Sequence, residues 1–576
     1  MDCKERIYSE EYADGIVDFA VNEFITEASD ACTIPLGEGF SLVYQNRSIA
    51  PDIPGSGYEY RYVPKLYGLM QIGSASAFGE AFDPKSLVEI GSLSLQEEPL
   101  SLTGRGTIIA FIDTGINFAD EAFKDEFGQT RILSIWDQTQ GGIAPSPMGF
   151  GYGSEYTRGQ IQAAIDGENP YAALPSRDGA LHGSILASVA AGSRLGNGEQ
   201  LLSPAPEAQL VVVKLKEAKN YLKSYYGVPG ETVCYEESDI MAGVAYAMQY
   251  AENFRRPLVI CLGVGTNQGA HTADGMLARL LETVSRKQGI SVVLCSGNEG
   301  NTQHHYQGRL SVRAEDAYED VEVFVEEGVR SFSMELWGQL PDTYTVSVRS
   351  PGGETIPPFR ISRESTREYR FVFEQTILVI QQVLVETAAG QQVVRFLFSG
   401  PTPGVWNFRV QSIGVTYDGT FHMWLPIRDF LPRDVRFLRP EPFATVTDPA
   451  GSESVIVVAA YDGETGGIDP ASGRGYMADG RIVPSVIAPG VDVSSRYGKR
   501  SGSSVAAALV SGGMAQFLQW AIVDGNDLLG GGQSAKSYLE KGAIRDVQQR
   551  YPNPTYGYGK ANIRGMLETM QDTGRQ

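Results

Sequence analysis

An α/β fold with a doubly wound parallel sheet, interrupted by an inserted antiparallel β domain and preceded by a small α+β region, is predicted by three observations. Between positions 107 and 300, short apolar runs rich in β-branched residues alternate with longer helical stretches, as in successive βαβ units. Between positions 305 and 443, short strands follow one another, separated by Gly, Pro and Asp turns. After position 445 the first pattern returns, so the α/β unit is interrupted and not finished.

The strands predicted for the parallel sheet are apolar throughout, as strands covered on both faces must be. They are TIIAFID, LVVVKL, PLVICLG and SVVLCSG before the interruption, and SVIVVAAYD and PSVIAPG after it. Helices are predicted over 183–191, 238–252, 275–288 and 504–522. We therefore expect one sheet with helices on both of its faces.

The interrupting region reads as an antiparallel sandwich or jelly roll. Its predicted strands are VEVFVEE, RSFSMELWG, TYTVSVRSP, REYRFVFEQ, ILVIQQVLVE, VVRFLFSG and VWNFRVQS. The expected division of the chain is an N-terminal region at 1–95, a first α/β part at 96–304, the inserted β domain at 305–444 and a second α/β part at 445–576.

The composition is that of a folded protein with several domains. Of its 576 residues, 42% are hydrophobic and 20% are charged. The chain has 47 basic and 69 acidic residues, and its net charge of −22 repels phosphate backbones and anionic lipid head groups. Nucleic acid and membrane surfaces are therefore not expected as partners. The acidic excess permits calcium, but no ligand cluster stands out, so no metal ligand is assigned and no cofactor is expected.

The cysteines and the N-terminus bear on the compartment. The five cysteines form no CxxC spacing, and two of them lie in apolar runs, so we expect reduced thiols in the core. The N-terminus carries acidic residues where a secretory signal would have a basic start and an apolar stretch. No run approaches 18 apolar residues, and a membrane span is not expected.

Three motifs carry side chains suited to nucleophilic catalysis. FIDTG places Asp113 at the carboxyl end of a buried strand, the edge where sites form in open α/β sheets. DGALHGSILASVAAG places His182 at the start of a helix of small residues. RSGSSVAAALVSGG places Ser504 at the start of an alanine-rich helix, with its hydroxyl exposed at the helix N-terminus.

Taken alone, each motif has an ordinary explanation. An aspartate can cap the next turn, a single histidine is often structural, and helices often begin with serine and alanine. DTG is also the signature of aspartic proteases, which need two such loops. The other DTG, at 572–574, lies in a polar tail with no strand before it, so this alternative is disfavoured.

Together, in the order Asp, His, Ser, the motifs resemble the subtilisin family of serine proteases, whose usual forms are D-T/S-G, H-G-T and G-T-S-x-A. The resemblance implies a catalytic triad of Asp113, His182 and Ser504. CSGNEGN resembles the family's oxyanion-hole loop, which implies that the Asn298 side-chain amide stabilises the tetrahedral intermediate. Cys261-Leu262-Gly263 matches the family's Ser-Leu-Gly strand, which implies that these residues bind the extended substrate backbone.

The sequence departs from the family pattern in three places. Ser184 replaces the threonine of H-G-T, Ser503 replaces the threonine before the nucleophile, and Cys261 replaces a serine. These are exchanges of one small residue for another, and they leave the roles open.

The long insertion and the segment TRILSIWDQTQGG resemble, more narrowly, the Csp-type clostridial proteases of spore germination. That resemblance implies an N-terminal prodomain that the enzyme removes itself, an inserted jelly roll, protein or peptide substrates, and a cytoplasmic or spore-associated location. The segment from Ile90 to Leu102 is expected to enter the cleft. Three function classes stay open: a protease that processes a germination zymogen, a broad degradative protease, and a catalytically idle binding protein.

Overall fold

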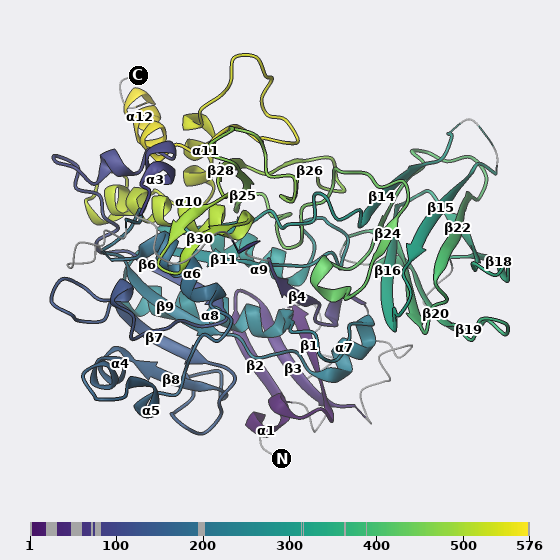
Figure 1. Ribbon diagram of the computed structural model, residues 1–576, viewed down its shortest axis with the longest axis horizontal. Coiled ribbons are helices and arrows are strands. Elements are labelled where there is room, and N and C mark those ends of the chain that lie inside the picture. The colour runs from purple at the N-terminus through teal and green to yellow at the C-terminus, as the bar shows by residue number, and fades with distance from the viewer. Residues whose placement is uncertain are drawn as a thin grey trace.

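The computed structural model describes residues 3–18, 32–47, 60–70, 73–74, 82–193, 202–312, 314, 316–361, 365–386 and 389–573. Its centre is an eight-stranded sheet, parallel except for the last strand (Figure 1). In spatial order the strands are β28 (Val486–Pro489), β25 (Ile456–Tyr461), β13 (Ile290–Cys295), β11 (Leu258–Leu262), β6 (Ile108–Asp113), β9 (Gln209–Lys214), β7 (Ile132–Asp137) and β8 (Ser154–Thr157). The predicted α/β class is confirmed, and β7 and β8 extend the sheet beyond the predicted strands.

Helices cover both faces of this sheet because successive strand residues point to opposite sides. On one face, Ile109, Phe111 and Val259 share a core cluster with α6 (His182–Ala191) and α10 (Ser503–Leu518). On the other face, alternate residues of the same strands share a second cluster with α8 (Glu237–Phe254) and α9 (Met276–Ser285). The remaining helices lie at the margins: α1 (Cys3–Tyr8), α3 (Lys85–Glu89), α4 (Arg158–Ile165), α5 (Pro170–Ala173), α7 (Asn220–Tyr226), α11 (Gly532–Gly542) and α12 (Ile563–Thr573).

One apolar helix is long enough by its composition to cross a bilayer. Within the described ranges, only Ser503–Val523, which is α10 with the π-helical turn that follows it, meets that test, and 89% of its most apolar window is buried. It packs against α6, β25, β11 and β13, so it is the central helix of the folded core.

The region after β13 forms two antiparallel sheets that share one apolar core, on the right of Figure 1. The six-stranded sheet contains β14 (His305–Arg309), β23 (Thr420–Trp424), β16 (Ser331–Gln339), β21 (Gln391–Ser399), β20 (Ile377–Glu386) and β19 (Ser365–Arg370). The five-stranded sheet contains β18 (Thr355–Arg360), β17 (Tyr344–Arg349), β22 (Gly404–Ser412), β15 (Tyr318–Val325) and β24 (Val435–Phe437). We refer to residues 305–444 as the β insert.

The N-terminal region forms a three-stranded antiparallel sheet that packs on α8. Its strands, in spatial order, are β1 (Tyr12–Asp18), β3 (Phe40–Asn46) and β2 (Cys32–Gly37). Cys3 and Cys32 form a disulfide, which corrects the expectation that all five cysteines are reduced. The other three, Cys234, Cys261 and Cys295, are free and buried, and burial raises the pKa of each thiol to about 12.

Four further short strands form two antiparallel pairs: β26 (Gly475–Tyr476) with β27 (Ile482–Val483), and β29 (Val493–Ser495) with β30 (Gly498–Ser501). The last of these, β30, leads directly into α10 and also pairs with β5 (Gly73–Ser74) from the N-terminal region. The N-terminal region therefore lies beside the strand that leads into α10.

Candidate active site

Asp113 and His182 meet at the carboxyl edge of the central sheet. Asp113 is the last residue of β6 and His182 is the first residue of α6. The His182 Nδ1 lies 2.8 Å and 2.9 Å from the two carboxylate oxygens of Asp113. Both side chains are buried, so this contact forms in a region of low dielectric, where it orients the imidazole strongly.

Two glycines make the close approach of Asp113 and His182 sterically feasible. A Cβ on Gly183 would overlap the backbone oxygen of Gly115, which cannot move aside without shifting the loop after β6. A Cβ on Gly263 would lie 2.8 Å from Cε1 of His182 and 3.2 Å from Oδ2 of Asp113, well inside van der Waals contact. Gly183 therefore allows the start of α6 to lie against the loop after β6, and Gly263 allows the chain after β11 to lie against the imidazole.

A second carboxylate, Asp178, holds the start of α6, and sequence reasoning missed it. Its Oδ1 accepts hydrogen bonds from Thr114 Oγ1 (2.7 Å) and the Leu181 N–H (2.8 Å). Its Oδ2 accepts from the Ser184 N–H (2.8 Å) and Ser184 Oγ (2.7 Å). Asp178 thus satisfies backbone donors at the helix start and ties the DTG loop to the helix that carries His182.

The pKa of His182 is raised above its ordinary value. Burial alone would lower this pKa, but the charge and hydrogen bond of Asp113, the Met70 carbonyl and the charge of Asp178 together outweigh it. Nδ1 faces Asp113, and Nε2 lies 3.1 Å from the Met70 carbonyl oxygen. An oxygen acceptor therefore faces each ring nitrogen, which favours the protonated form and accounts for the raised pKa.

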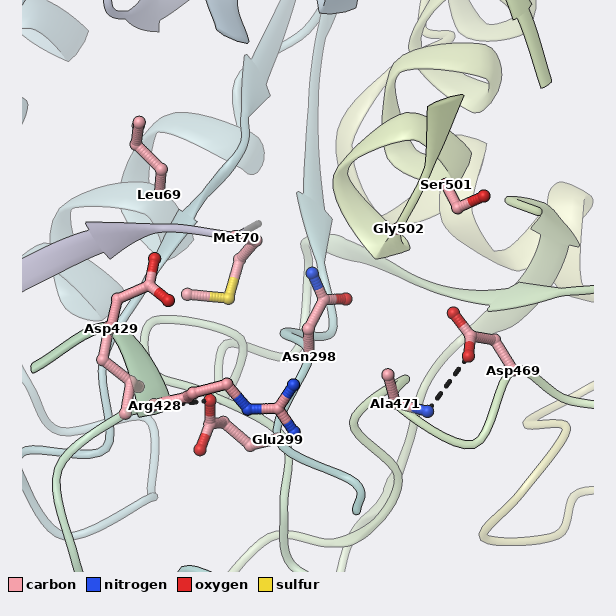
Figure 2. Close-up of a pocket in the computed structure, with 11 residues that line it drawn as sticks. Leu69, Met70, Asn298, Glu299, Arg428, Asp429, Asp469, Ala471, Ser501 and Gly502 are labelled. Atoms are coloured by element: carbon pink, nitrogen blue, oxygen red, sulfur yellow. Dashed lines mark hydrogen bonds between the residues drawn. The ribbon is translucent and has the colours of Figure 1, made fainter. Parts of the chain in front are cut away.

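The helix α10 brings Ser504 to the same place. Ser503 anchors the helix start, because its hydroxyl donates to the Gly297 carbonyl (3.0 Å) and to Oδ1 of Asn298 (2.9 Å). The Ser503 N–H also donates to Asn298 Oδ1, at 3.1 Å. These bonds orient the Asn298 side chain in the space between Met70 and Gly502 (Figure 2). The structure thus brings together all four residues that the motifs predicted: Asp113, His182, Ser504 and Asn298.

A strand of the N-terminal region runs through this site, which the sequence did not reveal. The strand β4 (Leu66–Leu69) lies between β10 (Tyr235–Glu236) and β12 (Val264–Gly265) and is antiparallel to both. At its end, the Met70 carbonyl oxygen accepts a hydrogen bond from Ser504 Oγ at 3.4 Å and lies 3.1 Å from His182 Nε2. One peptide carbonyl of the chain therefore faces the two residues that would act on it.

The strand that pairs with β4 differs from the predicted one by two residues. Cys261 and Leu262 lie inside β11, where their neighbours are the strands β13 and β6 of the central sheet. Only Gly263 of the predicted trio contacts the chain in the site, because its carbonyl accepts from the Met70 N–H at 3.1 Å. The pairing then continues along Val264 and Gly265, whereas Cys261 and Leu262 pair within the central sheet.

The segment from Ile90 to Leu102 does not enter the cleft, contrary to expectation. Ser92 Oγ donates to Gln516 Oε1 at 2.7 Å, and Gln516 Nε2 donates to the Leu102 carbonyl at 2.8 Å. Gln516 lies more than three turns beyond Ser504 on α10, which is about 18 Å along the helix axis. The segment therefore covers the far end of the helix.

The Met70 side chain occupies a narrow slot beside Gly265 and Thr447. A Cβ on Gly265 would overlap Oγ1 of Thr447 and would lie 3.2 Å from Cε of Met70, so glycine leaves room for both side chains. Thr447 closes the slot, since its side chain lies against the same faces of Gly265 and Gly297. An unbranched apolar side chain fits such a slot, and Met70 is only 2% exposed.

A cavity of about 240 Å³ opens beside Met70 and reaches Ser501 and Gly502 (Figure 2). Residues of the β insert form part of its wall, among them Ile427, Arg428 and Asp429. Burial raises the pKa of Asp429 to about 6, with the charge of Glu299 adding to the effect. The β insert therefore contributes directly to the walls of the cleft.

No group of three or more His, Cys, Asp or Glu side chains gathers as metal ligands would within the part of the chain that the structure describes. The other histidines have structural surroundings: His271 stacks on Trp424 at 4.0 Å, and His304 Nδ1 lies 2.8 Å from Glu299.

Comparison with known proteins agrees with this geometry. The sequence model of the subtilase family matches residues 104–336 and 438–559. The structure of the Clostridium perfringens CspB protease is 28% identical, with a TM-score of 0.74, and the match covers 85% of this chain and all 100% of that one. Fervidolysin from Fervidobacterium pennivorans, described as a keratinolytic enzyme related to subtilisin, is 14% identical with a TM-score of 0.44, over 97% of this chain and 61% of that one. A comparison with curated proteins found no match.

The family match covers more than half of the chain and leaves out most of the β insert. The chain is a subtilisin-like serine endopeptidase similar to CspB, and it belongs to the subtilase family.

Proposed function

We propose that this endopeptidase works through a triad of Asp113, His182 and Ser504, and that it cuts its own chain after Met70. The observation that carries the proposal is the position of the Met70 carbonyl oxygen, 3.1 Å from His182 Nε2 and 3.4 Å from Ser504 Oγ. The segment before it is paired on both sides in an extended conformation, as a protease holds a substrate. Gln71 lies outside the described residues, and the chain continues at β5, which pairs with the strand that precedes Ser504.

The proposed reaction proceeds through an acyl-enzyme. Ser504 Oγ attacks the Met70 carbonyl carbon while His182 Nε2 takes the hydroxyl proton, and Asp113 stabilises the imidazolium that forms. The Asn298 side-chain amide and the Ser504 N–H stabilise the oxyanion. His182 then gives its proton to the nitrogen of Gln71 as the peptide bond breaks. Water, activated by His182, hydrolyses the ester and leaves a carboxylate on Met70.

The purified wild-type protein is expected to consist of two fragments that separate between Met70 and Gln71. N-terminal sequencing should find a new terminus at Gln71, and intact mass should give the matching pair. A fluorophosphonate probe should label the larger fragment. An uncut chain that the probe does not label would contradict the proposal and favour an idle binding protein. A terminus at another position would refute Met70 as the cut site.

The rate of probe labelling is expected to fall as the pH drops, with an inflection above 6.5. Only neutral His182 can accept the proton of Ser504, and the pKa of His182 is raised above the ordinary 6.5. A raised pKa means that the ring becomes protonated at a higher pH, so the acidic limb of the rate profile shifts to higher pH. Labelling rates measured from pH 5 to pH 9 test this, and an inflection at or below 6.5 would contradict it.

We also propose, from the similarity to CspB, that residues 1–70 act as a prodomain of this enzyme and that a germination zymogen is a substrate in a cytoplasmic or spore-associated setting. The N-terminal sheet supports the first part, since buried Asp14 of β1 pairs with Lys219 and Asp18 pairs with Arg279 at 2.8 Å. Under this proposal, the boundary between the N-terminal region and the α/β core, expected after residue 95, lies instead at the end of β4. Digestion of casein at a rate similar to that of a candidate zymogen would instead favour a broad degradative protease.

A further inference from the structure

We propose that the β insert sets the substrate specificity of this protease: Ile427 restricts the third residue before the cut to glycine, within a recognition sequence of the form Tyr-Gly-x-Met. This inference rests on the proposed cut after Met70. The third and fourth residues before that cut are Gly68 and Tyr67. The substrate class is therefore an extended segment of a protein that presents these residues in this register.

The space around Gly68 has no room for a side chain. A Cβ on Gly68 would overlap Cδ1 of Ile427 and lie 3.3 Å from Cε1 of Phe430, where carbon atoms need about 3.5–4.0 Å. Gly68 lies within β4, opposite Gly265, and its φ is not in the left-handed region. The backbone therefore tolerates any residue at this position, and steric exclusion by the β insert is what requires glycine.

Packing and a neighbouring hydrogen bond hold Ile427 in the position where it excludes a side chain at Gly68. It is 1% exposed and belongs to the core cluster that also contains Trp337 and Trp424 of the β insert. Directly after it, the Arg428 N–H donates to Oε1 of Glu299 at 3.1 Å. These contacts attach the segment to the loop that carries Asn298, so Ile427 can yield only by displacing packed neighbours.

The fourth residue before the cut is recognised by its hydroxyl group. Tyr67 is fully buried, and its hydroxyl donates to Oδ2 of Asp448 at 2.9 Å. Asp448 is itself buried, so a substrate with phenylalanine at this position would leave a carboxylate oxygen without that partner. Leu69, between Gly68 and Met70, is only half-buried, and no restriction is inferred for it.

The test follows self-cleavage over time during cell-free synthesis of the full chain. Gly68→Ala is expected to slow the cut after Met70 at least about tenfold, since overpacking a buried contact costs on that scale. Ile427→Val removes only Cδ1, the atom that a Cβ on Gly68 would overlap. The double variant Gly68→Ala/Ile427→Val should therefore cleave within about threefold of Ile427→Val alone. Tyr67→Phe should slow the cut about tenfold through the lost hydrogen bond to a carboxylate.

A matched control separates steric relief from a general loosening of the β insert. Ile380 is a buried isoleucine of β20, and Ile380→Val combined with Gly68→Ala should stay as slow as Gly68→Ala. Rescue by Ile380→Val, or a Gly68→Ala chain that cuts at the wild-type rate, would overturn the inference. A double variant with Ile427→Val that stays slow would overturn it as well.

Peptides extend the test to other chains. The probe-reactive enzyme should cut Leu-Tyr-Gly-Leu-Met-Gln at least about tenfold faster than its Gly→Ala counterpart, and Ile427→Val should narrow that ratio. If the probe labels the enzyme but the enzyme cuts neither peptide, the inference that it recognises this sequence in other chains is contradicted. If the wild-type chain is not cut after Met70, the proposed function itself is refuted. If the wild-type chain is cut but Gly68→Ala has no effect on the rate, only this inference is refuted.

Discussion

Replacing Ser504 with alanine is expected to leave the chain uncut after Met70 and to lower the cleavage rate about a millionfold, the scale measured for the triad serine of subtilisin itself. Without Oγ, no atom at the start of α10 can form the ester with Met70. Intact mass after prolonged incubation, together with the fluorophosphonate probe, measures the loss. The free energy of unfolding should change by less than about 1 kcal/mol, because Oγ has one weak contact, at 3.4 Å to the Met70 carbonyl.

A serine on the same helix serves as the control. Ser511 is buried in α10, and its hydroxyl donates to the Ala507 carbonyl at 2.8 Å, away from the cleft. Ser511→Ala should cut after Met70 at nearly the wild-type rate. A Ser504→Ala chain that still produced a terminus at Gln71 would show that another nucleophile or another protease makes the cut.

Replacing Asp113 with asparagine is expected to lower the cleavage rate about ten-thousandfold while the chain stays folded. The asparagine amide would donate to Nδ1 of His182, which places the ring proton on Nε2. That tautomer cannot accept the proton of Ser504. The rate is read from self-cleavage during cell-free synthesis, and thermal unfolding confirms that the fold is retained.

The same exchange at Asp137 is the matched control. Asp137 ends β7 at the same edge of the sheet, and its Oδ2 accepts from Ser176 Oγ at 2.6 Å. Asp137→Asn should retain activity within about tenfold, because Asp137 does not contact His182 or Ser504 in the structure. If Asp113→Asn and Asp137→Asn lowered the cleavage rate equally, Asp113 would act by stabilising the edge of the sheet and not by orienting the imidazole.

Most of the central fold could be predicted from the sequence because the pattern is local. Apolar β-branched runs such as those of β6 and β13 have no alternative to a sheet covered on both faces. The small residues after His182 and Ser504 likewise predict closely packed helices. The positions of the three proposed triad residues were predictable for the same reason, since each lies where its own strand ends or its own helix begins.

The contacts that set specificity could not be predicted in this way. Met70 lines one cavity with Ile427 and lies against the same glycine, Gly265, as Thr447, although hundreds of residues separate Met70 from both, and none of the three lies in a motif. The pairing partner of β4 was hard to predict for a related reason: a shift of two residues from Cys261 to Gly263 keeps the strand pattern unchanged and alters only which residues extend beyond the sheet.

The sequence by itself determined that the chain forms an α/β core with an inserted β region and that Asp113, His182 and Ser504 are of catalytic types in the right order. Only the tertiary structure decided that β4 occupies the cleft, that Met70 faces the nucleophile, and that Ile427 excludes side chains at Gly68. The physical reason is that periodicity and helix starts are properties of neighbouring residues. Steric exclusion and hydrogen bonding in a cleft depend on which distant segments pack together.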